Sequence, residues 1–156
     1  MFDWFAAIWS WTTGAKLTLD MAPAAIRTAI RTRTKGYTVR FCSLDRPEFW
    51  VELVRHVSWV EKEMSFQLSF RKEVLDAKRI ENIKDLLERN GIACRESDLE
   101  KGPVIPIKDH EADALRIGIL IQDIFSETLG LSLEGIVRVR VKYRGQIDFR
   151  KKTQAW

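Results

Sequence analysis

Alternation of apolar and polar residues is the strongest pattern in this chain, and it predicts strands. Segments 37–42, 64–71 and 136–143 carry an apolar side chain at every second position. Successive side chains of a strand point to opposite faces, so each segment is typical of a half-buried strand. Residues 104–107 form a shorter apolar segment beside Pro103 and around Pro106. Because proline cannot donate a hydrogen bond to a neighbouring strand, we expect this strand at a sheet edge.

Helical spacing of apolar residues predicts two further elements. In segment 76–90 the apolar residues share one face, and Gly91 follows with the backbone freedom that a helix end needs. A second helix begins after Asp109, a good N-cap, and runs to Leu129 before Gly130. Its apolar face is wide, so we expect it to be the most buried helix. That face contains Ala114, Ile117, Leu120, Ile121, Ile124 and Phe125.

The first 60 residues hold weaker signals. Residues 2–11 are apolar around most of a helical circumference, and a second helix is predicted over 22–34 with Asp20 as its cap. Residues 16–20 form a linker or a short strand. The run Asp45-Arg46-Pro47-Glu48 resembles a capping box and predicts a helix from Pro47 to Val57, although the β-branched valines there also suit a strand.

From Met64 to Tyr143 the elements read strand, helix, strand, strand, helix, strand, with a short strand at 92–94 as the third. This order predicts an α+β fold, a ferredoxin-like split β-α-β sandwich over about residues 63–144. A preceding βα unit is expected to extend the sheet at one edge. We divide the chain into an N-terminal aromatic and basic helical segment, 1–35, and an α+β core domain, 36–156.

Charge is unevenly distributed along the chain. Residues 1–46 carry 7 basic and 3 acidic groups, residues 47–135 carry 12 basic and 18 acidic, and residues 136–156 carry 7 basic and 1 acidic. Both ends are therefore basic and the middle is acidic. Such asymmetry indicates either an anionic partner for the ends or attraction between the ends and the middle.

Half of the six tryptophans lie in residues 2–11, where the sequence is FDWFAAIWSW. A surface helix this apolar must be covered by its own domain, by a second copy of the chain, by another protein or by a membrane surface. A basic stripe on the following helix, which includes Arg27 and Arg31, would suit a membrane surface or another anion. The predicted partner-binding residues are Phe2, Trp4, Phe5, Trp9 and Trp11.

The closing strand has one apolar side and one cationic side. Arg138, Arg140, Lys142 and Arg144 would form a row with about 7 Å between successive side chains. Facing phosphates, this row and the basic tail could bind nucleic acid. The alternatives are that the row stays solvated or meets the acidic helices. The strands at 64–70 and 92–94 lack the aromatic run typical of RNA-binding versions of this sandwich.

The sequence contains no catalytic signature. Its glycines are too far apart for a phosphate-binding loop of the usual kinds. His56 and His110 are the only histidines, so no metal site or cofactor is predicted. Cys42 and Cys94 fall in predicted strands, which suggests buried thiols and a reducing, cytoplasmic location.

These observations favour a non-enzymatic interaction domain. We expect it to self-associate or to dock a protein partner through the aromatic segment 2–11. The first alternative is a nucleic-acid-binding domain that uses the basic closing strand and tail. The second is a peripheral membrane protein attached by its first 35 residues. Composition, with 46% hydrophobic and 31% charged residues, is that of an ordinary globular protein.

Overall fold

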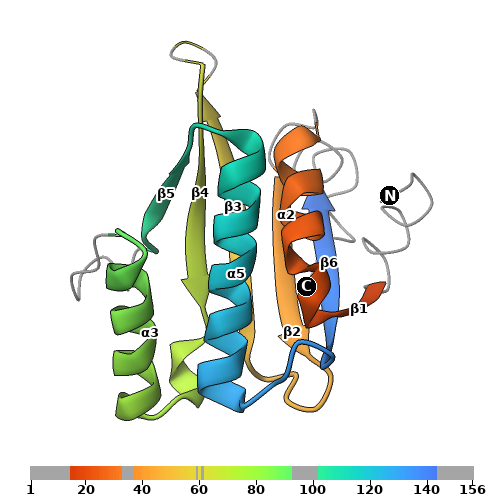
Figure 1. The fold of residues 1–156 in the computed structure, drawn as a ribbon, viewed down its shortest axis with the longest axis vertical. Coiled ribbons are helices and arrows are strands. Elements are labelled where there is room, and N and C mark those ends of the chain that lie inside the picture. Colours follow the sequence, from red (N-terminus) through yellow and green to blue (C-terminus); the bar gives the residue numbers. More distant parts are fainter. Residues whose placement is uncertain (1–14, 33–36, 59, 61, 93–101, 144–156) are drawn as a thin grey trace, which may run out of the picture.

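The computed structural model describes residues 15–32, 37–58, 60, 62–92 and 102–143 (Figure 1). Six strands within these residues form one antiparallel sheet in the order β1-β6-β2-β3-β4-β5. The strands are β1 (Ala15–Thr18), β2 (Tyr37–Ser43), β3 (Trp50–Ser58), β4 (Glu63–Phe70), β5 (Val104–Ile107) and β6 (Ile136–Tyr143).

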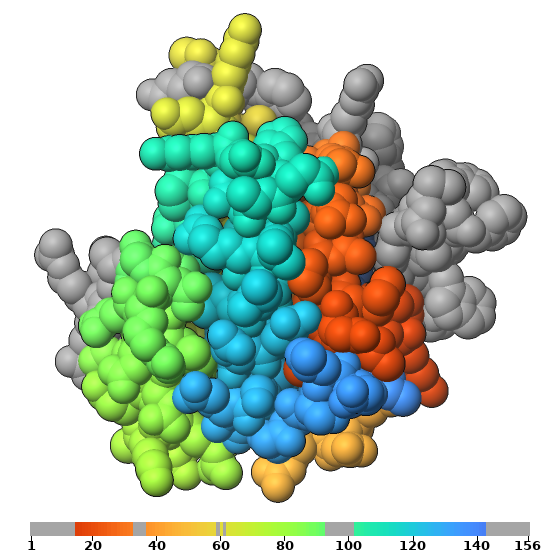
Figure 2. Space-filling model, viewed as in Figure 1, coloured from red at the N-terminus to blue at the C-terminus, as the bar shows by residue number. Residues whose placement is uncertain are grey.

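Three α-helices in the described part of the chain cover one face of this sheet. They are α2 (Ala22–Arg31), α3 (Ala77–Arg89) and α5 (His110–Leu129), with short 3-10 turns at η1 (Leu19–Met21) and η2 (Lys72–Val74). Figure 1 shows all three helices on the same side, and Figure 2 shows them side by side with α5 between α3 and α2. The fold is therefore α+β in two layers, one of helices and one of sheet.

The hydrophobic core lies between the two layers. Every second residue of each long strand is buried against the helices, as the alternation in the sequence predicts. The largest fully buried side chains are Tyr37, Phe41, Phe49, Phe66 and Phe125. α5 has eight buried residues, more than α2 or α3. The core also includes Leu19, which directly follows β1, and the apolar face of α2. The N-terminal elements therefore belong to the same core as the rest of the sheet.

Most predicted elements of the second half are confirmed. The strands at 64–70 and 136–143 and both helices lie where the periodicity places them, and β5 is an edge strand. Asp76 accepts a hydrogen bond from Arg79 N–H at 2.8 Å, and Asp109 accepts one from Ala112 N–H at 3.1 Å. Gly130 ends α5 in the left-handed conformation, with φ of 66°.

The predicted helix from Pro47 to Val57 is wrong. Residues 50–58 form β3, a central strand paired with β2 on one side and β4 on the other. The capping-box residues form the turn before it, in which Ser43 Oγ accepts hydrogen bonds from the N–H groups of Asp45 and Arg46. The β-branched residues fit the pleat, and two neighbouring strands satisfy the backbone on both sides.

Three smaller expectations also differ from the structure. β2 does not extend the sheet at an edge, because it lies between β6 and β3. α2 ends at Arg31, since Thr32 has extended backbone, and Asp20 accepts the hydroxyl of Thr18 rather than capping α2. Residues 16–20 form strand β1 and part of the turn η1.

Parts of three predicted elements lie outside the described residues. They are the aromatic segment 2–11, all of the predicted strand 92–94 except Ile92, and the basic tail from Arg144 onward. Ile92 itself is buried but belongs to no strand. The ferredoxin-like arrangement, which needs a strand at 92–94, therefore stays a prediction.

Candidate anion-binding face of the sheet

Strand β6 presents its cations on the face of the sheet that the described helices leave uncovered. Val137, Val139 and Val141 of the same strand are buried in the core, so the alternating Arg138 and Arg140 lie on the opposite face. The helices and their acidic residues cover the apolar side instead (Figure 1). The predicted meeting of this row with the acidic helices is therefore not what the structure shows.

Strand pairing brings further cations beside this row. Directly paired residues of an antiparallel sheet share a face, and Arg138 pairs with Lys16 of β1 while Arg140 pairs with Arg40 of β2. Lys142 continues the row along β6 and pairs with Thr38. We call these five cations, Lys16, Arg40, Arg138, Arg140 and Lys142, the basic face.

One carboxylate on this surface is already paired. Glu52 of β3 lies opposite Arg40 and accepts from its Nε at 2.8 Å and from its Nη2 at 2.7 Å. The two side chains are only 14% and 19% exposed, so this ion pair, in which both arginine donors reach Glu52 Oε2, is largely shielded from water. The guanidinium of Arg40 also lies 4.3 Å from the centre of the Trp50 ring. Arg40 is thereby held in place, and Arg138 and Arg140 face it across the strands.

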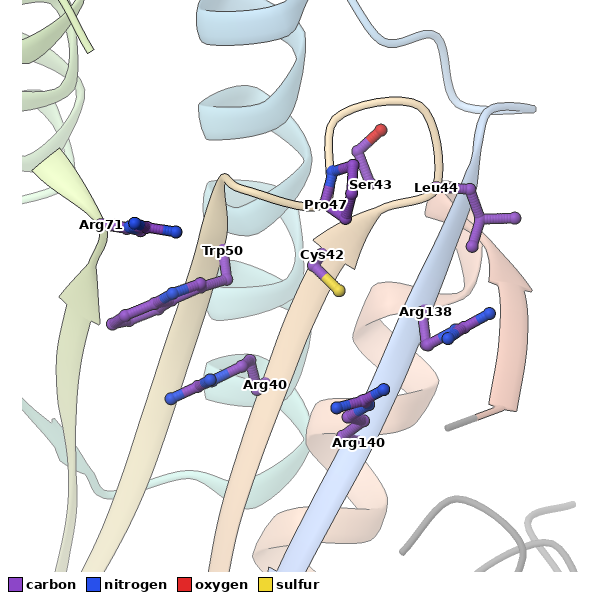
Figure 3. A pocket seen from close by; sticks show the side chains of 9 residues that line it. All are labelled: Arg40, Cys42, Ser43, Leu44, Pro47, Trp50, Arg71, Arg138 and Arg140. Atoms are coloured by element: carbon purple, nitrogen blue, oxygen red, sulfur yellow. The ribbon is translucent and has the colours of Figure 1, made fainter. Parts of the chain in front are cut away.

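A pocket of about 460 Å³ opens at one end of the basic face (Figure 3). It lies where the turn between β2 and β3 approaches β6, and Figure 3 shows that turn above Cys42. Four of its nine lining residues are arginines, and none of the nine is acidic. The lining residues are Arg40, Cys42, Ser43, Leu44, Pro47, Trp50, Arg71, Arg138 and Arg140.

Two donors in this pocket lack a hydrogen-bond partner. The Nε atoms of Arg138 and Arg140 are buried, and neither has a partner among the residues that the structure describes. A buried donor without an acceptor costs about 1–3 kcal/mol, and more when the group is charged. An anion in the pocket could supply acceptors to both once the two side chains turn toward it.

Cys42 lines this pocket but is not activated. Burial raises the pKa of its thiol above the ordinary value, and the positive charges of Arg140, Arg138 and Arg40 offset this only in part. The thiol is therefore protonated near neutral pH, and nucleophilic chemistry through a thiolate is disfavoured.

Arg27 and Arg31, predicted to bind anions, lie on the helix layer instead of the basic face. Both pair with Glu111 of α5, and the Arg27 Nε to Glu111 Oε2 distance is 3.0 Å. These ion pairs join α2 to α5 on the far side of the sheet. Their role as anion ligands stays a prediction.

The remaining predicted site residues include several that the structure does not describe. Phe2, Trp4, Phe5, Trp9, Trp11 and Arg144 lie outside the described residues. The predicted docking role of segment 2–11 and the predicted membrane attachment by the first 35 residues therefore stay predictions. His56 Nε2 lies 3.1 Å from Gln67 Oε1, and within the described ranges no three His, Cys, Asp or Glu side chains group to hold a metal.

Sequence reasoning missed Lys16, Arg40, Trp50 and Arg71 as members of this site. The alternation in segment 37–42 places Arg40 on the polar side of a strand, which was a usable signal. Its position opposite Arg140 depends on β2 pairing with β6, and the two strands are about a hundred residues apart in the chain. Trp50 lies within the segment Pro47 to Val57, for which we predicted a helix, so the sequence did not indicate its place beside Arg40.

Comparisons of the chain with protein-family models, with curated proteins and with solved structures yield no match. None of the helices in the described ranges combines the length and the apolarity that crossing a membrane requires. Evidence about function therefore comes from the geometry of the basic face.

Proposed function

We propose that this chain binds single-stranded nucleic acid across the basic face of its sheet. The observation that supports this is the separation of charge by layer. Five cations share the face opposite the described helices, while Glu111, Asp113 and Glu127 pair with arginines on the helix layer. A concentrated group of cations on one face of a sheet is suited to a polyanion.

The shape of the surface favours a single strand over a duplex. Alternate residues of a strand are about 7 Å apart and neighbouring strands about 4.8 Å apart, so the cations form a broad two-dimensional array. An extended single strand can lie on such an array with its backbone along β6. Arginine guanidinium groups also stack on bases, which adds contacts that do not depend on base sequence.

Polar residues continue the same face beyond the cations. Ser65, Gln67 and Ser69 of β4 lie on it beside His56 of β3. On the part of this face that β3 and β4 form, these side chains provide hydrogen-bonding groups for sugars and bases. If residues 63–144 adopt the proposed ferredoxin-like arrangement, this open face corresponds to its helix-free surface.

The test compares two double variants that remove the same charge from opposite layers. Binding of a labelled single-stranded 20-mer is measured by fluorescence anisotropy between about 50 and 300 mM salt. We expect Arg138→Gln with Arg140→Gln to lower affinity and to reduce the slope of log K against log salt by about 1.4. The matched control, Arg27→Gln with Arg31→Gln, should bind like the unaltered chain.

Two results would overturn the proposal. One is the absence of measurable binding by the unaltered chain at the lowest salt concentration. The other is an equal loss of affinity in the helix-layer control, which would move the site away from the sheet. Thermal melts of each variant establish that the change lies in binding and not in folding.

A further inference from the structure

We infer that the pocket beside the β2–β3 turn binds a terminal phosphate monoester, so that the basic face holds a strand by its phosphorylated end. This inference rests on the proposed function and assigns a ligand to one part of the same surface. It follows from the charge of the pocket, its unsatisfied donors and the turn that closes it.

The charge of the pocket suits a monoester better than an internal phosphodiester. Arg40, Arg71, Arg138 and Arg140 line it, none of its lining residues is acidic, and Arg40 already binds Glu52. A phosphate monoester carries about −1.5 to −2 charges at pH 7, whereas a diester carries one. The doubly charged group therefore gains more from this concentration of guanidinium groups.

The unsatisfied donors indicate where the phosphate oxygens would lie. Arg138 Nε and Arg140 Nε are buried and lack partners among the described residues, and Arg138 and Arg140 line the same side of the pocket. A terminal phosphate has three oxygens that can accept from arginine, and bidentate contacts to guanidinium are favoured. Once these side chains turn toward the pocket, the ligand would supply hydrogen bonds that the described residues leave unmade.

The turn between β2 and β3 closes one end of this pocket. Ser43, Leu44 and Pro47 of the turn line the pocket, and Figure 3 shows the turn across the end of the strands. In the other direction the basic face continues along β6 from Arg140 to Lys142. A strand that follows the cations toward the turn would therefore end in the pocket.

Trp50 and Arg71 form the opposite side of the pocket, where the terminal nucleotide itself would lie. In Figure 3 the side chains of Arg71, Trp50 and Arg40 follow one another down that side. Arg71 Nη1 donates to the carbonyl oxygen of Glu48 at 3.3 Å, which holds the guanidinium at the rim. A volume of about 460 Å³ is in the range of small-ligand pockets.

The experiment measures an affinity ratio for three hexanucleotides of identical sequence, with a 5′-phosphate, a 3′-phosphate or hydroxyl groups at both ends. We expect one of the phosphorylated ends to lower Kd about tenfold relative to the hydroxyl ends at pH 7.5. The second charge titrates near pH 6, so the ratio should fall at pH 5 but stay above one, because the monoester keeps its first negative charge. Arg71→Gln should reduce the ratio to about twofold.

A matched control separates the pocket from the rest of the face. Lys142 belongs to the basic face but does not line the pocket. Lys142→Gln should weaken all three hexanucleotides by the same factor and leave the ratio unchanged. If Arg71→Gln does not fold, Arg138→Lys serves as the pocket variant, because it keeps the charge but removes the bidentate fork.

The failure of this inference and of the proposed function are distinguishable. Equal Kd values for all three ends, with salt-dependent binding retained, would overturn the end-binding inference alone. Binding of inorganic phosphate or a nucleoside monophosphate without binding of any oligonucleotide would overturn both and indicate a small-molecule site. If Arg71→Gln and Arg138→Lys both leave the affinity ratio unchanged, the phosphorylated end binds outside this pocket and the end-binding inference fails.

Discussion

Arg55 is a buried arginine whose partners are backbone carbonyl groups. Its side chain is 4% exposed, and Nη1 donates to the carbonyl oxygens of Ala29, at 2.7 Å, and of Thr32 at the end of α2. The last carbonyls of a helix carry partial negative charge, so the guanidinium stabilises this end of α2. It also lies 5.4 Å from the ring centre of Tyr37. Arg55 therefore joins the helix layer to the sheet.

Replacing Arg55 by methionine should destabilise the protein. The change keeps much of the volume but leaves the carbonyls of Ala29 and Thr32 without this donor, which should cost on the order of 2–3 kcal/mol. Urea denaturation measures this loss. Arg46→Met in the exposed β2–β3 turn is the control and should change stability by less than about 0.5 kcal/mol. A loss of similar size in the control would show that arginine removal alone causes the effect.

Asp113 links stability to pH near the start of α5. Partial burial would raise its pKa, but hydrogen bonds from the N–H groups of Lys108 and Asp109 and from Arg116 outweigh this, so its pKa is lowered. A lowered carboxyl pKa stabilises the fold above the unfolded-state pKa of about 3.9, and this contribution is lost as pH falls through the folded-state pKa.

We therefore expect Asp113→Asn to lower the melting temperature at pH 7. The difference from the unaltered chain should shrink as the pH is lowered through the acid range, because the native carboxyl then becomes protonated. Melting curves from pH 2 to pH 7 measure both effects. A difference that stays constant over this range would show that Asp113 acts through neutral hydrogen bonds instead of its charge.

At the scale of elements, the crossing of α2 and α5 depends on one glycine. A Cβ atom added at Gly118 would lie 2.5 Å from Pro23 Cα and 2.6 Å from Pro23 N, both backbone atoms. Gly118 is buried within α5, so the missing side chain is what allows the two helices to approach this closely. Glycine inside a helix costs conformational entropy on folding, and the close packing of α2 against α5 compensates for that cost.

Gly118→Ala should destabilise the fold although alanine is the better helix former. Overpacking against a rigid backbone costs about 1–3 kcal/mol, while the gain in helix propensity is about 1 kcal/mol. We expect a net loss in urea denaturation. Ser126→Ala, at an exposed position of the same helix, is the control and should be neutral or slightly stabilising. A stabilised Gly118→Ala would show that α2 moves away without cost.

Elements differ in how far local sequence predicts them. α3 and α5 have caps, stops and one-sided apolar spacing, so their bounds follow from local interactions. β3 shows the opposite case. The residues before it resemble a capping box, and its own residues suit either a helix or a strand. The pairing of β3 with β2 and β4 selects the strand, and those contacts join residues far beyond a helix turn.

At the scale of the whole molecule, the sheet separates two kinds of charge environment. The helix layer pairs its acids with its own arginines, as in Arg27 with Glu111 and Arg89 with Glu127. The basic face gathers cations from three strands and includes the ion pair between Arg40 and Glu52. Like charges placed opposite one another across strands repel. This repulsion lowers the stability of the fold, as expected of a binding site.

Removing one cation of the basic face should leave stability unchanged or raise it. Arg140→Gln relieves repulsion from Arg40 and Arg138, so we expect a melting temperature equal to or above that of the unaltered chain at 10 mM salt. The difference should vanish near 1 M salt, where charges are screened within about 3 Å. Melting curves in sodium chloride measure this. A melting temperature that is clearly lower at both salt concentrations would mean that Arg140 has a structural role.

By itself, the sequence determined the local elements, the two-sided character of β6 and the edge position of β5, because alternation, helical spacing and proline act through neighbouring residues. Only the tertiary structure decided that β2 lies inside the sheet, that residues 50–58 form a strand, and that Arg40, Arg138 and Arg140 meet around one pocket. Arg40 and Arg140 meet because β2 pairs with β6, about a hundred residues away in the chain, and β3 forms because it pairs with β2 and β4. No short segment of the sequence contains these pairing interactions.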